Sequence, residues 1–132
     1  MEKKNTKPKQ IIGRKELVDF PELEVKGIQA KIDTGAYSNT LHCSEIKVQD
    51  KKLCFKVLNE KEHCFETFSQ KKIKNSFGEA EKRYIIRTKI KIAGRVIKSI
   101  ISLSNRGNMR YPVLIGRRLL KNKFVVDVSL KN

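Results

Sequence analysis

The most informative part of the sequence is the ten-residue segment Ala30-Lys31-Ile32-Asp33-Thr34-Gly35-Ala36-Tyr37-Ser38-Asn39. Apolar residues occupy every second position at Ile28, Ala30 and Ile32, which is the alternation of a β-strand with one buried face. The run then stops in Asp-Thr-Gly, so it places Asp33 at the rim of a sheet. The glycine that follows lets other groups approach the backbone closely. Taken alone, however, an Asp before Thr-Gly is most often a plain turn.

A second segment changes this interpretation. Tyr111-Pro112-Val113-Leu114-Ile115-Gly116-Arg117-Arg118-Leu119-Leu120 is an apolar strand that ends in Gly and leads into a short helical turn. Together the two segments resemble the retropepsin-type aspartic peptidases. In that family an apolar strand leads into Asp-Thr-Gly-Ala, and a later strand leads into Ile-Gly-Arg and two leucines. The matching positions are Ile32 to Ala36 and Leu114 to Leu120.

The closer resemblance is to bacterial retropepsin-like proteins usually labelled "ATP-dependent zinc protease". Three further blocks carry it: Ile12-Gly13-Arg14-Lys15-Glu16, Phe20-Pro21-Glu22-Leu23 and Ser76-Phe77-Gly78-Glu79-Ala80-Glu81-Lys82-Arg83. The matching blocks cover most of residues 11 to 128. The resemblance implies an all-β fold, a small closed or partly open β-barrel of the retropepsin type with one short C-terminal helix.

Periodicity predicts the same class of structure. We expect a disordered basic arm over residues 1–9 and one barrel domain over residues 10–132. The first strand is predicted from Ile11 to Phe20, and a hairpin corner from Val25 to Ile28. Further predicted strands are 40–42 with 44–49 as its continuation, 52–58, 64–68, 84–92, 95–103, 113–115 and 124–128, with a turn at 105–108 and a short helix at 117–121. The polar segment 69–83 is predicted to be a mobile loop or a hairpin tip.

The chemistry implied by the resemblance needs two carboxylates. In aspartic peptidases the pair shares one proton and holds one water, which the ionised member deprotonates while the protonated member polarises the scissile carbonyl. This chain has a single Asp-Thr-Gly, and neither Asp19 nor Asp127 follows a strand in that context. We therefore expect a homodimer in which each subunit contributes Asp33 as the catalytic residue.

The resemblance also gives roles to the neighbours of Asp33. Thr34 should hydrogen-bond to the partner subunit's loop, Gly35 should lie against the substrate backbone, and the apolar strand before Gly116 should pack behind the loop. In retropepsins the Arg after this glycine pairs with an acid four positions beyond the catalytic Asp, but here that position is Tyr37. The predicted active-site support residues are Thr34, Gly35, Ala36, Leu114, Ile115, Gly116 and Arg117.

A flap or substrate-contacting loop is predicted over residues 76–83. The alternative for its acids is that they are plain solvated charges, and the loop has one glycine where retropepsin flaps have several. The predicted substrate-binding residues are Tyr37, Ser76, Gly78, Glu79, Glu81 and Arg83.

The chain is strongly basic, with a formal net charge of +16. From Lys82 to the end it has fourteen Lys or Arg and one acid, Asp127. This charge fits either a solvated basic face or an anionic partner, namely nucleic acid, an acidic peptide or a membrane surface. The pattern shows no recognition helix and no aromatic stacking platform, which disfavours nucleic acid. No apolar run is long enough for a membrane span or a signal peptide, so a cytoplasmic location is expected.

The chain has three cysteines, Cys43, Cys54 and Cys64. In an intracellular protein of bacterial type we expect them to be reduced thiols. Together with His42 and His63 they offer donors of the type that zinc prefers. Yet the chain lacks Cys-x-x-Cys, His-Glu-x-x-His and a phosphate-binding Gly-Lys-Ser/Thr loop. We therefore expect no metal and no cofactor.

Two functions of different classes compete. The first is a homodimeric aspartic endopeptidase that uses Asp33 and acts on peptides or proteins, with acidic or glutamate-tailed substrates as a hypothesis. The second is a non-catalytic peptide-binding module, because relatives are often associated with ATP-grasp ligases that add glutamate to proteins. A basic nucleic-acid binder is a weaker third reading.

Overall fold

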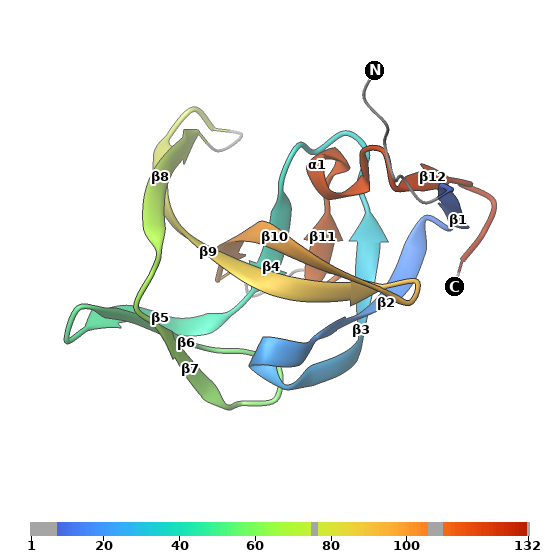
Figure 1. Cartoon of the computed structure of the whole chain (residues 1–132). Coiled ribbons are helices and arrows are strands. Elements are labelled where there is room, and N and C mark those ends of the chain that lie inside the picture. Colours follow the sequence, from blue (N-terminus) through green and yellow to red (C-terminus); the bar gives the residue numbers. More distant parts are fainter. Residues whose placement is uncertain (1–7, 75–76, 106–109, 132) are drawn as a thin grey trace, which may run out of the picture.

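The computed structural model describes residues 8–74, 77–105 and 110–131. Its elements follow one another as β1 (Gln10–Ile12), β2 (Lys15–Phe20), a 3-10 turn (Pro21–Leu23), β3 (Val25–Ile32), β4 (Asn39–His42), β5 (Ser44–Gln49), β6 (Lys52–Lys56), β7 (Glu62–Phe65), β8 (Ser69–Lys74), β9 (Ala80–Ile92), β10 (Arg95–Ser104), β11 (Val113–Ile115), α1 (Arg117–Leu120) and β12 (Phe124–Val126) (Figure 1). Of the predicted turn at 105–108 and the predicted arm at 1–9, residues 106–108 and 1–7 lie outside the described part.

Six strands form a closed barrel. They follow the order β10-β4-β11-β3-β2-β9, and β9 pairs with β10 to complete the ring. β11, from the second half of the chain, lies between β3 and β4, which come from the first half. The barrel therefore brings the two motif segments side by side. The prediction of an all-β barrel with one short helix is confirmed, and the barrel is closed.

The barrel interior is filled by the alternating face of each strand. Along β9, Ile86, Thr88, Ile90 and Ile92 are buried, while the residues between them face solvent. This is the face that the sequence pattern predicts, although Tyr84 at its start is only half-buried. The tight turn at Ala93-Gly94 is also present, with both residues at positive φ.

The N-terminal prediction was wrong in two places. The expected single strand from Ile11 to Phe20 is interrupted, because β1 pairs with β12 and β2 pairs with β3. Gly13 lies between the two strands, where the chain changes partner. A side chain does not fit there, because a β-carbon would lie 2.5 Å from the Leu130 carbonyl oxygen. The hairpin corner is the 3-10 turn at Pro21–Leu23, and the expected corner at Val25 to Ile28 is part of β3 instead.

The predicted return strand after the Asp33 loop also ends early. β4 stops at His42, and β5 belongs to a separate three-stranded sheet with β6 and β7. This sheet lies beside the barrel, at the lower left in Figure 1. Leu53, Phe55 and Val57 are buried, as their alternation predicts.

The expectation of three reduced thiols was wrong. Cys54 on β6 stands directly opposite Cys64 on β7, with 4.1 Å between their Cα atoms, and the two form a disulfide bond. Cys43 is free and buried. The pairing depends on the register of two strands, which cysteine spacing alone does not give.

The segment predicted to be a mobile loop or a hairpin tip contains two paired strands. β8 pairs with the first half of β9 from Ser69↔Ile85 to Lys74↔Ala80, so these residues form the two arms of a hairpin. No helix within the described residues is long and apolar enough to span a membrane.

Candidate active site

The backbone of Asp33 is hydrogen-bonded to β11, the strand that carries the second motif. β3 and β11 run parallel, with Ile32 in register with Ile115. The Asp33 amide continues this ladder by donating to the Ile115 carbonyl at 2.8 Å. Because Ile32 and Ile115 are both buried, the backbone position of Asp33 is fixed by the barrel core.

Two backbone amides of the loop after Asp33 donate hydrogen bonds back to Asp33. The Gly35 amide donates to Asp33 Oδ1 at 3.1 Å, and the Ala36 amide donates to the Asp33 carbonyl at 3.1 Å. The Asp33 side chain is half-buried, whereas Thr34 and Gly35 are exposed. The carboxylate is therefore held in place yet remains open to a water or a substrate.

The start of α1 holds the other end of the loop. The Arg117 amide donates to the Ala36 carbonyl at 2.9 Å, and the Arg118 amide donates to the Tyr37 carbonyl at 3.0 Å. Gly116 permits this approach, because a β-carbon there would lie 2.5 Å from the Ser38 carbonyl oxygen. The two motif segments thus form one unit, as the resemblance implies.

Arg117 has contacts that replace the missing acid. Its Nη1 donates to the Thr34 carbonyl at 3.3 Å and to the Gly35 carbonyl at 3.2 Å. Its guanidinium carbon also lies 5.6 Å from the centre of the Tyr37 ring, which is within cation–π range. The contact between Arg117 and Tyr37 thus takes the place of the ion pair that this arginine forms with an acid in retropepsins.

Asn39 is a site residue that the sequence reasoning missed. It is 1% exposed, and its Oδ1 accepts the Gly116 amide at 2.9 Å. Its Nδ2 donates to Ser99 Oγ and to the Ile100 carbonyl, both at 3.0 Å. The available signal was an amide residue at the first position of a strand, just after the motif loop.

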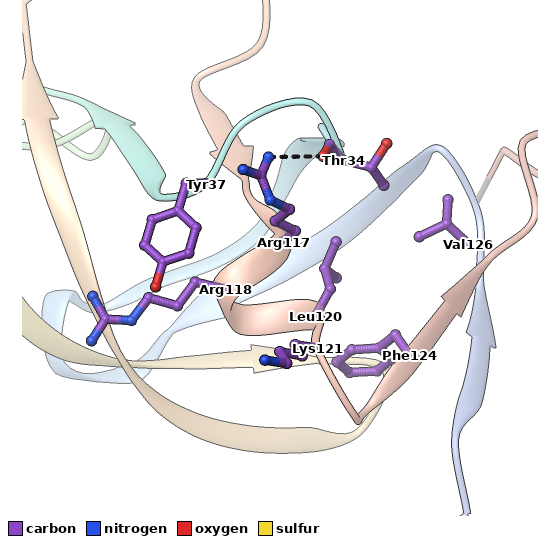
Figure 2. Close-up of a pocket in the computed structure, with 8 residues that line it drawn as sticks. All are labelled: Thr34, Tyr37, Arg117, Arg118, Leu120, Lys121, Phe124 and Val126. Atoms are coloured by element: carbon purple, nitrogen blue, oxygen red, sulfur yellow. Dashed lines mark hydrogen bonds between the residues drawn. The ribbon is translucent and has the colours of Figure 1, made fainter.

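A cavity of about 660 Å³ adjoins the loop. Figure 2 shows its two sides: Tyr37, Arg117 and Arg118 gather at one side, and Leu120, Phe124 and Val126 form the other. Thr34 also lines the cavity, and its carbonyl accepts the Arg117 hydrogen bond drawn in Figure 2. It therefore offers an apolar wall next to a cationic rim.

The described residues of the predicted flap are not brought to Asp33. Gly78, Glu79, Glu81 and Arg83 belong to the β8–β9 arm, which stands at the left of Figure 1, away from β3 and α1. Arg83 Nε pairs with Glu81 Oε1 at 3.1 Å, Gly78 has a φ of 81°, and Glu79 is exposed. Ser76 lies outside the described residues.

No group of three or more His, Cys, Asp or Glu side chains that could hold a metal ion occurs in the part of the chain that the structure describes. His42 Nδ1 and His63 Nε2 are buried without a hydrogen-bond partner. They lie on β4 and β7, which belong to different sheets.

Comparison with known proteins supports the resemblance. The model of the RimB-like family, described as retropepsin-like aspartic endopeptidase RimB, matches residues 11–132. A probable alpha-L-glutamate ligase of Shewanella pealeana is 33% identical over 92% of this chain. A protein of the same description from Desulfotalea psychrophila is 31% identical over 93% of this chain. In both cases the match spans 29% of the length of the relative.

The crystal structure of the Legionella pneumophila protein Lpg0085, described as a protein of unknown function (DUF785), has a similar fold. The TM-score is 0.76 at 28% sequence identity, and the match covers 94% of this chain and 97% of that one.

Proposed function

Because the chain belongs to the RimB-like family of retropepsin-like aspartic endopeptidases, we propose that it is an aspartic endopeptidase. It works as a homodimer in which each subunit supplies one Asp33. The observation that carries this proposal is the position of Asp33: its backbone is fixed by the hydrogen bond to Ile115, and it is half-buried just after the end of β3.

The proposed reaction uses the two Asp33 carboxyls as a pair. Two carboxylates around one water share a single proton, because ionising both is electrostatically costly. The ionised member takes a proton from the water, which attacks the scissile carbonyl. The protonated member donates a hydrogen bond to the carbonyl oxygen, and the proton then passes to the leaving amine.

Exposed features of the Asp33 loop and of strands β1 and β12 support association with a second copy. Thr34 is exposed at the tip of the loop, beside the apolar wall of the cavity. On the paired strands β1 and β12, Ile11 and Val125 stand opposite each other and are 66% and 49% exposed. Burial of such apolar surface stabilises a dimer by about 25 cal/mol per Å² before the costs of association.

Acidic or glutamate-tailed peptides are the proposed substrates. The net charge of +16 favours polyanionic ligands by raising their local concentration and their rate of association. Peptides with an extended backbone also fit a site whose reactive group lies at the end of a strand.

The test is an Asp33→Asn substitution, which removes the acid and keeps the shape of the side chain. We expect the variant to remain a dimer by analytical ultracentrifugation and to lose cleavage of acidic peptides by at least about a thousandfold. Equal cleavage by the variant and the wild type would eliminate the aspartic mechanism.

One observation favours a second function. The relatives that match this chain are named probable alpha-L-glutamate ligases, and the match accounts for 29% of their length. The domain would then present an acidic peptide to an ATP-grasp ligase without cutting it. Peptide binding that is the same in the wild type and in Asp33→Asn, with no cleavage by either, supports this accessory role.

A further inference from the structure

Lys31 lies close to the proposed catalytic residue. It is two residues before Asp33 on the extended chain, and Ile32 between them points into the core. Since side chains alternate along a strand, Lys31 faces outward from β3, and Asp33 follows directly after the last residue of this strand. Two residues of an extended chain span about 6.7 Å, which is also the repeat of side chains on one face of an extended peptide.

Three cations gather at this position. Lys15 stands directly opposite Lys31 across the β2–β3 pair. Lys15 Nζ lies 5.3 Å from the centre of the Tyr111 ring, and the guanidinium carbon of Arg110 lies 5.9 Å from it. Leu114, half-buried and in register with Lys31, provides an apolar neighbour. We name Lys15, Lys31, Arg110 and Tyr111 the basic cluster.

The pKa of Tyr111 is consistent with this gathering of positive charge. A hydrogen bond with Lys15 holds the pKa of the Tyr111 hydroxyl below its usual range, and the charges of Lys15, Arg110 and Lys31 act in the same direction. All three cations therefore act on one point of the surface.

In the part of the chain that the structure describes, the cations of the basic cluster form no ion pair with an acid. Within residues 8–74, 77–105 and 110–131, no carboxylate lies within 4.0 Å of the charged nitrogens of Lys15, Lys31 or Arg110. The cations of the β5–β7 sheet differ: Lys47, Lys52 and Lys56 each pair with a glutamate. Like charges directly opposite on neighbouring strands destabilise a sheet, so the arrangement of Lys15 and Lys31 costs stability in the free protein.

We propose that the basic cluster is a subsite that binds a carboxylate side chain of the substrate beside the scissile bond. A glutamate that reaches between Lys15 and Lys31 relieves their repulsion, and its methylene groups contact Leu114. The Tyr111 hydroxyl donates a further hydrogen bond to the carboxylate. This assignment rests on the proposed function for the position of the bond that is cut, and it adds the residues that select the substrate.

The first experiment measures binding alone, in an Asp33→Asn background that cannot cut. The probes are two fluorescein-labelled octapeptides, one with four glutamates alternating with serines and one with four glutamines in their place. We expect the glutamate peptide to bind more tightly, and Lys31→Gln or Lys15→Gln to weaken its binding by about three- to tenfold without affecting the glutamine peptide.

Lys47→Gln is the matched control, because it removes the same charge from a lysine that pairs with Glu62 on the other sheet. It should leave the preference for glutamate unchanged. If the control lowers the preference as much as Lys31→Gln does, general attraction by the net charge replaces the subsite.

The second experiment compares cleavage of the same two peptides by enzymes with Asp33 intact. Cleavage without any preference for glutamate overturns the subsite and leaves the peptidase in place. Binding that depends on Lys31, with no cleavage by the wild type, overturns the peptidase and leaves the subsite in place. We expect the wild type to favour the glutamate peptide in kcat/KM and Lys31→Glu to reverse that order.

Discussion

Asn39 and Gly116 form a buried hydrogen bond that orients the Ile115–Gly116 peptide group, to which the Asp33 amide is also bonded. Asn39 Oδ1 accepts the Gly116 amide at 2.9 Å, and the carbonyl of the same peptide group, on Ile115, accepts the Asp33 amide at 2.8 Å. One peptide plane thus receives the buried amide side chain at one end and the proposed catalytic residue at the other. The orientation of this plane decides where Asp33 lies.

Replacing Asn39 with alanine should therefore impair both folding and catalysis. The change leaves the Gly116 amide buried without a partner, which costs about 1 to 3 kcal/mol of the free energy of unfolding. We expect kcat to fall more than tenfold at a temperature where the variant is folded, as measured by urea denaturation and peptide cleavage.

Thr40→Ala is the control for this effect. Thr40 Oγ1 lies 3.3 Å from Ser102 Oγ and joins β4 to β10, as Asn39 does, but the Gly116 amide donates to Asn39 and not to Thr40. We expect its loss to reduce stability and to leave kcat within twofold of the wild type. If Asn39→Ala also keeps its kcat, the amide has only a structural role.

Glycine at position 116 should matter for the stability of the fold, whereas glycine at position 35 should matter for function. A β-carbon at Gly116 would lie 2.5 Å from the Ser38 carbonyl oxygen and 2.8 Å from that of Tyr37, and backbone cannot move aside cheaply. We expect Gly116→Ala to lower the free energy of unfolding by about 1 to 3 kcal/mol.

At Gly35 the nearest atom to a β-carbon is Asp33 Oδ1 at 3.4 Å, an ordinary contact. Gly35→Ala should keep its thermal midpoint within about 2 °C of the wild type and raise KM, because the methyl group occupies space for the substrate backbone. Equal losses of stability in the two variants would contradict this distinction.

The pairs of strands explain why the sequence predicts the motif unit but not the disulfide. Alternating apolar residues identify Ile32 and Ile115 as buried strand residues, and the resemblance places Asp33 and Gly116 next to them. The partner of Cys54, however, depends on the register between β6 and β7, and the spacing of the cysteines does not give that register. Three cysteines at separations of about ten residues permit several pairings.

The same limit applies to Asn39 and to Arg117. The residue type of Asn39 is visible in the sequence, but its bonds reach Ser99 and Gly116, which are distant along the chain. For Arg117 the sequence shows that the usual acid is missing. That the guanidinium lies over Tyr37 and bonds to two carbonyls follows only from the folded loop.

The disulfide leads to a direct prediction of thiol content. A thiol reagent should detect one thiol per chain in the unfolded oxidised protein and three after reduction, because Cys43 alone is free. Closing a loop of this size stabilises the folded state by about 2 to 3 kcal/mol, so a Cys54→Ala, Cys64→Ala variant should unfold at a lower urea concentration. Three reactive thiols in the unreduced protein would contradict the pairing.

Cys43 should make stability sensitive to high pH. Burial raises the pKa of the Cys43 thiol to about 12, so the folded protein retains a proton that the unfolded chain loses. The stabilisation is complete below the unfolded pKa of roughly 8.5 and is lost as the pH rises towards 12, by about 1.4 kcal/mol per pH unit. The measurement is urea denaturation from pH 8 to 11 of the wild type and of Cys43→Ala, whose difference isolates the thiol from the lysines. Parallel pH profiles would show that Cys43 does not contribute.

We expect Asp33 to act only together with its symmetry mate. A crystal structure of the assembled protein would show this through the separation of the two Asp33 carboxyl groups. We expect a twofold dimer in which both carboxyls lie within about 3 Å of one shared water. A monomer, or a dimer whose Asp33 carboxyls are too far apart to bind the same water, would contradict it.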